Sequence, residues 1–428
     1  MLFQRSAAST SPETLPEATT APKTLLPPAV YQQLERLYGS TQTAPEVIDL
    51  LLQYGAVNGV SDLIIEPYEH AALVRVRLDG ILHEVSRIPA EMCSAVISRI
   101  KVLANLDSSS LREVAQEGKF VLRTEKEPVT VRVAIAQVAG GEMVALRLHD
   151  SSTMSGGLSD HGMPDSIVQQ YTKLLQAKSG LILVCGPTGG GKTSTLYSSL
   201  QILNTGMTNI ISIEDPVEYI LPGINQMEVN AEFGLSFARG LRVTLRLNPD
   251  IIFVGEIRDQ ETARIAMESS LTGHLVLSTL HANSAVSAIS RLRDLEIERF
   301  FISASLKAAL CQRLVRRSCT ICGTWNAPQA DEAALFEQMM HRPLEKQFSS
   351  PGCEACAGTG FKGRIGIYEI IVVNDGIRTL ISNAQSEDEM SNVLRKNGFH
   401  SLLEDGLEKV EQGLTTVVEV VSHAYSGD

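Results

Sequence analysis

Eight consecutive residues, 186–193, have the composition of a loop that can hold phosphate groups. Their sequence, GPTGGGKT, matches the pattern G-x-x-x-x-G-K-[ST] at each defined position. The apolar run LILVC precedes the loop and the helix-like run TSTLYSSLQIL follows it. Glycines let backbone N–H groups turn toward phosphate oxygens, and the start of the following helix favours an anion. We therefore expect a nucleotide site, because a glycine-rich turn without a ligand would rarely stand in this context.

Two side chains of this loop have specific expected roles. Lys192 would reach the β- and γ-phosphates of a nucleoside triphosphate, and the hydroxyl of Thr193 would bind Mg²⁺. ATP and Mg²⁺ are accordingly the expected cofactors. The complete set of expected nucleotide-binding residues is Gly186, Pro187, Thr188, Gly189, Gly190, Gly191, Lys192, Thr193 and Ser194.

Acidic residues flank the next two apolar runs. The first run, ISIEDPVEY, supplies Glu214, Asp215 and Glu218 at its carboxyl end, and the second, NPDIIFVGEIRD, supplies Asp250 before the strand and Glu256 after it. Open α/β sheets bind ligands at the carboxyl ends of their strands, so these acids are candidates for holding a metal or activating water. Taken singly, each could equally be a solvated strand end.

A third apolar run, HLVLSTLH, begins with His274 and ends with His281. A lone histidine in such a run is more often a satisfied core residue. Because three successive strand ends present polar groups, we expect His281 to read the γ-phosphate or to orient the water. Glu256 follows Gly255, which is unusual, since the acid of P-loop enzymes normally follows its strand directly.

Four cysteines form two C-x₂-C pairs that are separated by thirty residues. Each pair makes one knuckle, and two knuckles close a tetrahedral site around Zn²⁺, with no position left open for catalysis. An iron–sulfur cluster fits this pairing less well, and disulfides are disfavoured in a reducing compartment. The expected zinc ligands are Cys319, Cys322, Cys353 and Cys356. The remaining cysteines stand in apolar surroundings and are expected to pack in the core: Cys93, Cys185 and Cys311.

The composition limits the classes of protein to consider. The chain has 428 residues, enough for two or three domains, and a formal charge of −12. An acidic chain with 5% aromatic residues does not suit a protein that grips nucleic acid over its surface. No apolar run reaches the roughly 18–20 residues of a membrane-spanning helix, and the first twenty residues lack a signal-peptide core. We expect a soluble, cytosolic protein.

The patterns predict an α/β fold class with several parts. Mixed helix and strand patterns form a small N-terminal α/β domain, and apolar strands that alternate with helices predict a parallel sheet covered by helices. A cysteine module is inserted after this sheet, and the C-terminus is helical. The expected parts are a flexible leader (1–44), the N-terminal domain (45–150), a Gly/Ser-rich linker (151–162), the P-loop domain (163–317), the cysteine module (318–370) and the C-terminal helical region (371–428).

Taken together, these motifs resemble the secretion ATPases that drive type II secretion and type IV pilus assembly. The resemblance covers nearly nine-tenths of the chain. It rests on the phosphate loop, on the acidic box ISIEDPVEY, and on GLRVTLRLNPDIIFVGEIRDQETARIA, TGHLVLSTLHAN, QRLVRRSC and FKGRIGIYE. It implies an N-terminal domain hinged to a RecA-like motor domain, assembled as a hexamer with ATP between the two domains.

The resemblance also implies roles for particular residues. The catalytic glutamate of the family falls on Glu218, with Glu214 as second choice; the metal-side glutamate falls on Glu256 and the phosphate-sensing histidine on His281. Arginines that reach the phosphates from the N-terminal domain match Arg132 and Arg147. Two further arginines, on the helix before the second acidic strand, match Arg242 and Arg246.

The implied function is a mechanochemical ATPase that moves a platform protein of the inner membrane, together with a cytoplasmic adaptor. Such a protein would be cytoplasmic and would associate peripherally with the membrane through these partners. The cysteine module favours an assembly ATPase over a retraction ATPase, which lacks it. A P-loop motor acting on nucleic acid and a DNA-uptake pilus ATPase remain alternatives, and a small-molecule kinase would need an acceptor pocket and a lid for which no segment is evident.

Overall fold

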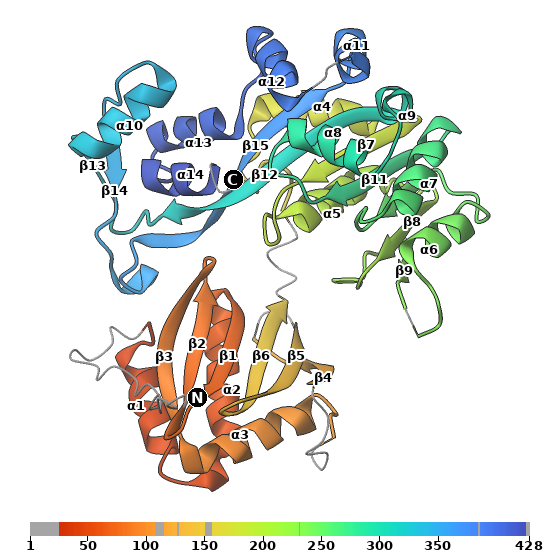
Figure 1. The fold of residues 1–428 in the computed structure, drawn as a ribbon. Coiled ribbons are helices and arrows are strands. Elements are labelled where there is room, and N and C mark those ends of the chain that lie inside the picture. Colours follow the sequence, from red (N-terminus) through yellow and green to blue (C-terminus); the bar gives the residue numbers. More distant parts are fainter. Residues whose placement is uncertain are drawn as a thin grey trace, which may run out of the picture.

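The computed structural model describes residues 25–107, 115–125, 128–149, 156–230, 232–383 and 386–424. The expected leader up to residue 24, the first half of the expected linker and the last four residues of the chain lie outside these ranges. Figure 1 shows a smaller N-terminal domain, coloured red to yellow, beside a larger domain that contains the rest of the described chain.

The N-terminal domain is a six-stranded antiparallel sheet with helices on one face. The strand order is β3-β2-β1-β6-β5-β4. Helix α2 packs on β1, and α3 packs on β2 and β3. The elements are α2 (Ala44–Asn58), β1 (Val60–Pro67), β2 (Ala71–Leu78), β3 (Ile81–Pro89), α3 (Ala90–Leu103), β4 (Ala115–Leu122), β5 (Val129–Val138) and β6 (Gly141–His149).

Alternation along the strands separates the two faces of this sheet. In β5, Val131 and Val133 point into the core, and Arg132 between them points to the opposite face. In the cross-strand register, Arg132 lies beside Arg147 of β6, which in turn lies beside Asp62 of β1. The open face therefore carries a row of charged side chains.

The structure corrects the expected boundary of the leader. Helix α1 (Pro28–Leu37) precedes a short 3₁₀ turn (Thr41–Thr43), and both belong to the N-terminal domain. Leu25, Leu26 and Leu34 are buried in the domain's core. The sequence placed all of 1–44 in the leader, but it also predicted a short amphipathic helix at Ala29–Tyr38. Helix α1 confirms that helix, and the three leucines bury enough apolar surface to dock the segment on the domain.

The larger domain is built on a seven-stranded sheet of order β15-β12-β7-β11-β10-β8-β9. All neighbouring strands from β12 to β9 are parallel, and β15 pairs antiparallel with β12. The strands are β7 (Gly180–Cys185), β8 (Ile210–Glu214), β9 (Asn225–Glu228), β10 (Ile251–Val254), β11 (Leu275–Leu280), β12 (Leu306–Ser318) and β15 (Phe361–Val372).

Helices cover both faces of this sheet, which confirms the predicted α/β architecture. One apolar cluster joins a sheet face to α6, α7, α8 and α9, and another joins the opposite face to α4 and α5. Cys185 and Cys311 are buried in the first cluster, as expected. The helices are α4 (Asp165–Leu175), α5 (Lys192–Leu203), α6 (Phe237–Thr244), α7 (Gln260–Leu271), α8 (Ala285–Asp294) and α9 (Arg299–Ser305).

The structure also moves the boundary of the cysteine module. Strands β12 and β15 pair from Ala308 opposite Val372 to Ser318 opposite Phe361, so 361–370 belong to the sheet and not to the module. The module lies between these two strands. It contains β13 (Thr324–Asn326), α10 (Ala330–Met340), β14 (Gln347–Ser349) and a 3₁₀ turn (Glu354–Cys356).

The described part of the C-terminal region contains four helices, of which α13 and α14 pack on β12 and β15, α11 packs on α9 and α12 packs on α8. They are α11 (Asp375–Asn383), α12 (Glu387–Lys396), α13 (Leu402–Glu411) and α14 (Val417–Ala424). Gly398 and Gly413, both at positive φ, lie between the last three. Phe336 of α10 is buried against α13 and α14, so the module also has an apolar attachment.

Candidate nucleotide site and metal centre

The phosphate loop joins β7 to α5 and has little space around its glycines. Gly186 has φ of 146°, and a Cβ there would lie 2.3 Å from the carbonyl oxygen of Gln312. Gly191, with φ of 85°, directly precedes Lys192, the first residue of α5. Only glycine fits these two positions without moving the backbone. The loop is therefore held in a fixed shape at the start of a helix, where an anion is favoured.

Gln312, a buried residue of β12, supports the loop and was not expected from the sequence. Its Nε2 donates to the carbonyl oxygen of Gly190 at 2.8 Å, and its Oε1 accepts from the hydroxyl of Thr195 at 2.7 Å. The side chain thus links the loop to the first turn of α5. The sequence signal that could have revealed it is a glutamine directly after the apolar residues AALC, because a buried amide needs partners.

The side chain of Lys192 folds back onto the first residues of the phosphate loop. Its Nζ donates to the carbonyl oxygens of Gly186 and Pro187, each at 2.8 Å. Burial lowers the pKa of the ammonium group, while Glu256 is among the groups that oppose this shift. The amine can reach a phosphate bound in the loop by exchanging these carbonyl contacts for phosphate oxygens.

Glu256 and His281 lie together at the ends of neighbouring strands. The His281 Nε2 is 3.5 Å from a carboxylate oxygen of Glu256, whose other oxygen pairs with Arg258. Burial and the charge of Lys192 lower the pKa of His281, and its side chain is 53% exposed. The imidazole therefore stays neutral over more of the physiological pH range and is accessible to a ligand.

Gly255 has a structural reason that the sequence alone did not give. Its N–H donates to the carbonyl oxygen of Ile213 at 2.7 Å, and a Cβ would lie 3.1 Å from that oxygen and 3.3 Å from Cα of Glu214. The backbone after β10 thus approaches β8 so closely that a side chain at this position would push the β8 backbone away by a few tenths of an ångström. This approach brings Glu256 to the edge of the sheet where the phosphate loop lies.

A cavity of about 290 Å³ opens beside the phosphate loop. Its wall includes Gly186 and Pro187 of the loop, His281 after β11, Arg291 of α8 and Glu387 of α12. The loop and the expected sensing histidine therefore face one common space.

Glu214 is buried and its oxygens have three side-chain donors. The hydroxyls of Tyr197 and Ser212 and the amide of Gln226 all donate to it. The carboxylate is 3% exposed. These contacts suit a residue that fixes β8 against α5, and they leave Glu218 as the more accessible of the two glutamates of this box.

Glu218 lies where the two domains meet. Arg132 of the N-terminal sheet donates to its carboxylate at 2.9 Å and approaches the carbonyl oxygen of Val217 at 3.4 Å. The Glu218 N–H donates to the Tyr197 hydroxyl at 3.3 Å, which connects it to α5. Burial raises the pKa of Glu218, and the positive charges of Arg132 and Arg147 oppose that shift. A raised pKa is the property that a general base for water requires.

Arg147 is in the same charged row, but it pairs within its own domain. Its Nε donates to Asp62 at 2.9 Å, and the Arg147 side chain is largely exposed. Arg77 of β2 also reaches Asp62, at 3.3 Å. Lys119 of β4 extends the row on the far side of Arg132 and is exposed.

The structure does not bring the other two expected arginines into this group. Arg242 of α6 pairs with Glu261 of α7, and both side chains are exposed. Arg246 lies beyond the end of α6 and not on the helix, because α6 ends at Thr244, and its side chain is exposed. Among the contacts of the described residues, none joins either arginine to the phosphate loop or to Glu218.

Three other polar residues of these strands have local partners. Asp215 is 3.6 Å from Arg258. Asp250 precedes β10 and accepts from the N–H of Asn209 at 2.7 Å, and the His274 ring, at the start of β11, contacts the carbonyl oxygen of Ser269 at 2.9 Å. Asp250 and His274 therefore lie at the strand ends opposite to the phosphate loop.

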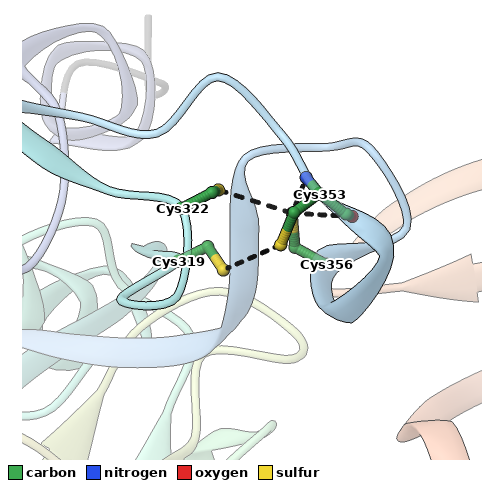
Figure 2. Close-up of side chains that lie close together, drawn as sticks. All are labelled: Cys319, Cys322, Cys353 and Cys356. Carbon is green, nitrogen blue, oxygen red and sulfur yellow. Dashed lines mark hydrogen bonds between the residues drawn. The ribbon is translucent and has the colours of Figure 1, made fainter.

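The four expected zinc ligands lie together at the far ends of β12 and β15 (Figure 2). The sulfur–sulfur distances are 3.9 Å for Cys319 and Cys353, 4.0 Å for Cys322 and Cys356, and 3.8 Å for Cys353 and Cys356. A tetrahedron with Zn–S bonds of about 2.3 Å has edges of about 3.8 Å. The Cys353 N–H also donates to the Cys356 sulfur at 3.1 Å. These thiols fit Zn²⁺.

A second bridge connects the two domains near this centre. The N–H of Gly363, at the start of β15, donates to Asp79 at 2.9 Å, and Asp79 lies in the turn between β2 and β3. Ala357, next to the second cysteine pair, packs against the apolar core of the N-terminal domain. The domains are therefore in contact both at Glu218 and at the cysteine module.

Comparisons with known proteins agree with this arrangement. A family model described as "Type II/IV secretion system protein" matches residues 39–422. "Type II secretion system protein E" of Pectobacterium carotovorum is 44% identical over 375 residues, which cover 88% of this chain and 74% of the relative. "Type II secretion system ATPase E" of Vibrio cholerae is 42% identical over 391 residues, which cover 91% of this chain and 77% of the relative.

Solved structures show the same fold. The pilus retraction motor PilT with bound ADP matches with a TM-score of 0.61 and 26% identity, over 89% of this chain and 97% of that protein. The ATPase DotB of Legionella pneumophila matches with a TM-score of 0.66 and 20% identity, over 88% of this chain and 95% of that protein. Within the described ranges, no helix combines the length and apolar character needed to cross a bilayer. The family match spans most of the chain, and this protein belongs to the type II/IV secretion system protein family.

Proposed function

We propose that this chain hydrolyses ATP in the cleft between its two domains, and that the cycle powers assembly of a type IV pilus or of the pseudopilus of type II secretion. The names of its relatives, "Type II secretion system ATPase E" among them, support the reaction and its purpose. The observation that carries the proposal is the contact between Arg132 and Glu218, which joins the N-terminal sheet to the acidic segment after β8. The Glu218 N–H in turn donates to the hydroxyl of Tyr197 on α5, the helix that follows the phosphate loop.

On the phosphate-loop side, the residues bind and orient the triphosphate. The loop N–H groups and Lys192 would hold the phosphates, and Thr193 and Glu256 are the residues that would hold Mg²⁺. Bound Mg²⁺ would neutralise charge on the phosphate oxygens. Glu218, with its raised pKa, takes a proton from the attacking water, and His281 reads the γ-phosphate from the neighbouring strand.

On the opposite side, Arg132 and Arg147 supply positive charge from a separate rigid body. A guanidinium that contacts the transferring phosphoryl group stabilises the charge that develops there. Because that contact needs the γ-phosphate, hydrolysis would release the N-terminal domain, and the release would be the mechanical step. Arg242 and Arg246 have no described contact with the phosphate loop, Glu218 or these two arginines, so we assign them no role within one chain.

The partners and location follow from the family. We expect a homo-hexamer in the cytoplasm, held at the inner membrane by a platform protein and a cytoplasmic adaptor. Zn²⁺ on the four cysteines would be structural. Neither the comparisons nor the charge of −12 favours a motor that acts on nucleic acid.

The experiment that tests the proposal compares two substitutions in the same charged row. Arg132→Ala should lower the kcat of ATP hydrolysis by roughly tenfold or more, because it removes charge at the phosphoryl group. Lys119→Ala removes a positive charge from the neighbouring strand and should change kcat by less than about twofold, as exposed surface substitutions do. Equal effects of the two substitutions on kcat would contradict a specific role for the domain interface.

A further inference from the structure

We infer that two buried charged residues, Glu369 and Arg313, position the loop that follows His281 and connect it to the C-terminal helices. This inference rests on the proposed role of His281 in hydrolysis. The two residues come from the neighbouring strands β15 and β12, and neither contacts the phosphate loop through a described bond. They are therefore positioning residues and not catalytic ones.

Glu369 holds the starts of two helices at once. One carboxylate oxygen accepts from the N–H of Ala285 at 2.6 Å, and the other accepts from the N–H of Leu402 at 3.0 Å. These are the first residues of α8 and α13. The side chain is 4% exposed, and a carboxylate at a helix start satisfies free N–H groups and the helix dipole. One buried group thus couples α8, which follows the His281 loop, to the C-terminal region.

Arg313 makes a parallel connection from the adjacent strand. It donates to the carbonyl oxygen of Asn283 at 3.1 Å and to the carbonyl oxygen of His423 in α14. Burial raises the pKa of Glu369 above its ordinary value. The two N–H donors and the positive charge of Arg313 partly oppose that rise. The two residues therefore form one buried unit of opposite charges that spans from the loop to α13 and α14.

The loop itself is short, so these contacts determine where His281 lies. Strand β11 ends at Leu280 and α8 begins at Ala285, which leaves four residues between them. The His281 ring has one described ionic contact, at 3.5 Å, and is half exposed. Its position is therefore set mainly by the backbone of the next residues, which Arg313 and Glu369 hold. A small displacement of such a group from the reacting atoms is enough to slow a reaction substantially.

Asp405 provides a matched control for Glu369. It is a buried carboxylate of α13 that accepts from the N–H of Tyr368 at 2.7 Å and pairs with Lys409. It fixes the same helix to the same strand, and among the described contacts none joins it to the His281 loop. Glu369→Gln and Asp405→Asn each replace one buried carboxylate with an amide of the same shape, so both should lower the melting temperature.

The experiment measures kcat, KM, the melting temperature and the affinity for a fluorescent ADP analogue in the full chain. Glu369→Gln should lower kcat on the order of tenfold, with KM and ADP affinity changed by less than about threefold. Asp405→Asn should leave kcat within about twofold. The double variant Glu369→Gln/His281→Ala should be no slower than His281→Ala alone, because both changes disable the same group.

Two results would overturn the inference. One is an equal loss of kcat in Glu369→Gln and Asp405→Asn when both variants lose the same amount of melting temperature. The other is a double variant in which the two losses multiply. If Glu369→Gln does not fold, Arg313→Gln takes its place, with the same expected fall in kcat at a nearly constant KM. Turnover that survives Lys192→Ala would instead refute the proposed function, and it can be recognised independently of either result.

Discussion

The two sides of the proposed ATP cleft are built in different ways. The phosphate-loop side consists of consecutive residues between a fully buried strand and a helix, and Gln312 braces it from the neighbouring strand. The N-terminal side consists of side chains on the open face of a sheet, and Arg132 and Arg147 are each held there by one carboxylate. The first side is formed in advance, whereas the second can exchange its partners.

This difference suggests how the second side responds to ATP. A phosphate and a carboxylate are similar partners for a guanidinium, so a triphosphate can compete with Glu218 for Arg132. Arg132 opposes the rise in the pKa of Glu218 that burial causes. When Arg132 turns to phosphate, that opposition decreases, the pKa of Glu218 rises further, and the carboxylate becomes a stronger base. Domain closure and activation of the water would thus be linked.

The largest expected effect is on the side that is formed in advance. Lys192→Ala should reduce ATP hydrolysis by at least about a hundredfold and should also weaken nucleotide binding, because the ammonium contacts the phosphates throughout the cycle. Steady-state phosphate release and binding of a fluorescent nucleotide measure the two effects. Normal turnover in this variant would remove the loop from the mechanism.

Next in size is the loss of the metal-side carboxylate. Glu256→Gln should leave nucleotide bound but uncleaved, with kcat lower by roughly a hundredfold, because its negative charge is needed near the metal while the loop still holds the phosphates. Single-turnover hydrolysis compared with nucleotide affinity tests this split. A variant that hydrolyses ATP at the normal rate would contradict the role of Glu256.

On the N-terminal side of the cleft, a substitution should affect kcat more than nucleotide affinity. Arg147→Ala should slow hydrolysis by about tenfold and should spare nucleotide affinity more than Lys192→Ala does, since the arginine is needed mainly in the transition state. The measurement compares the loss of kcat and the loss of nucleotide affinity in Arg147→Ala with the same two losses in Lys192→Ala. If both variants lose binding equally, Arg147 only holds the nucleotide.

The pH dependence of Arg132→Ala sharpens the comparison. Glu218 must be deprotonated to act as a base, so activity falls as the pH drops through its pKa. Burial already raises this pKa and Arg132 opposes the rise, so removing Arg132 should shift the acidic limb of the kcat/KM profile to higher pH. Lys119→Ala serves as the control and should leave the limb in place. A shift to lower pH in Arg132→Ala would show that another group controls the limb.

The smallest effect on nucleotide chemistry should come from the metal centre. We expect about one Zn²⁺ per chain by elemental analysis, as a closed Cys₄ site requires. Cys319→Ser should lower the metal content and the melting temperature, while nucleotide affinity of the folded fraction changes by less than about threefold, because the thiols have no described contact with the loop. A folded protein with four intact cysteines and no metal would contradict the zinc assignment.

The parts that the sequence predicted well are those set by local spacing. The phosphate loop consists of eight consecutive residues between a strand and a helix. The spacing of the two C-x₂-C pairs is sufficient to predict a metal site. The parallel sheet could be predicted because its strands alternate with helices. The family followed from several long motifs taken together.

The parts that the sequence did not predict depend on distant contacts. Strand 361–372 was assigned in part to the cysteine module, because its pairing with β12 reaches across the whole insertion. The burial of Glu214 depends on Tyr197 and Gln226, which come from other elements. The docking of Leu25 and Leu26 was not predicted because the average composition of the first residues is polar, which hides the contribution of two adjacent leucines.

The most direct test of the interdomain mechanism is a crystal structure of the chain with a non-hydrolysable ATP analogue and Mg²⁺. The mechanism predicts guanidinium nitrogens of Arg132 and Arg147 at about 2.7–2.9 Å from phosphate oxygens in at least one subunit, with Glu218 released from Arg132. Triphosphate contacts confined to the P-loop domain in every subunit, with the N-terminal sheet remote from the nucleotide, would contradict it.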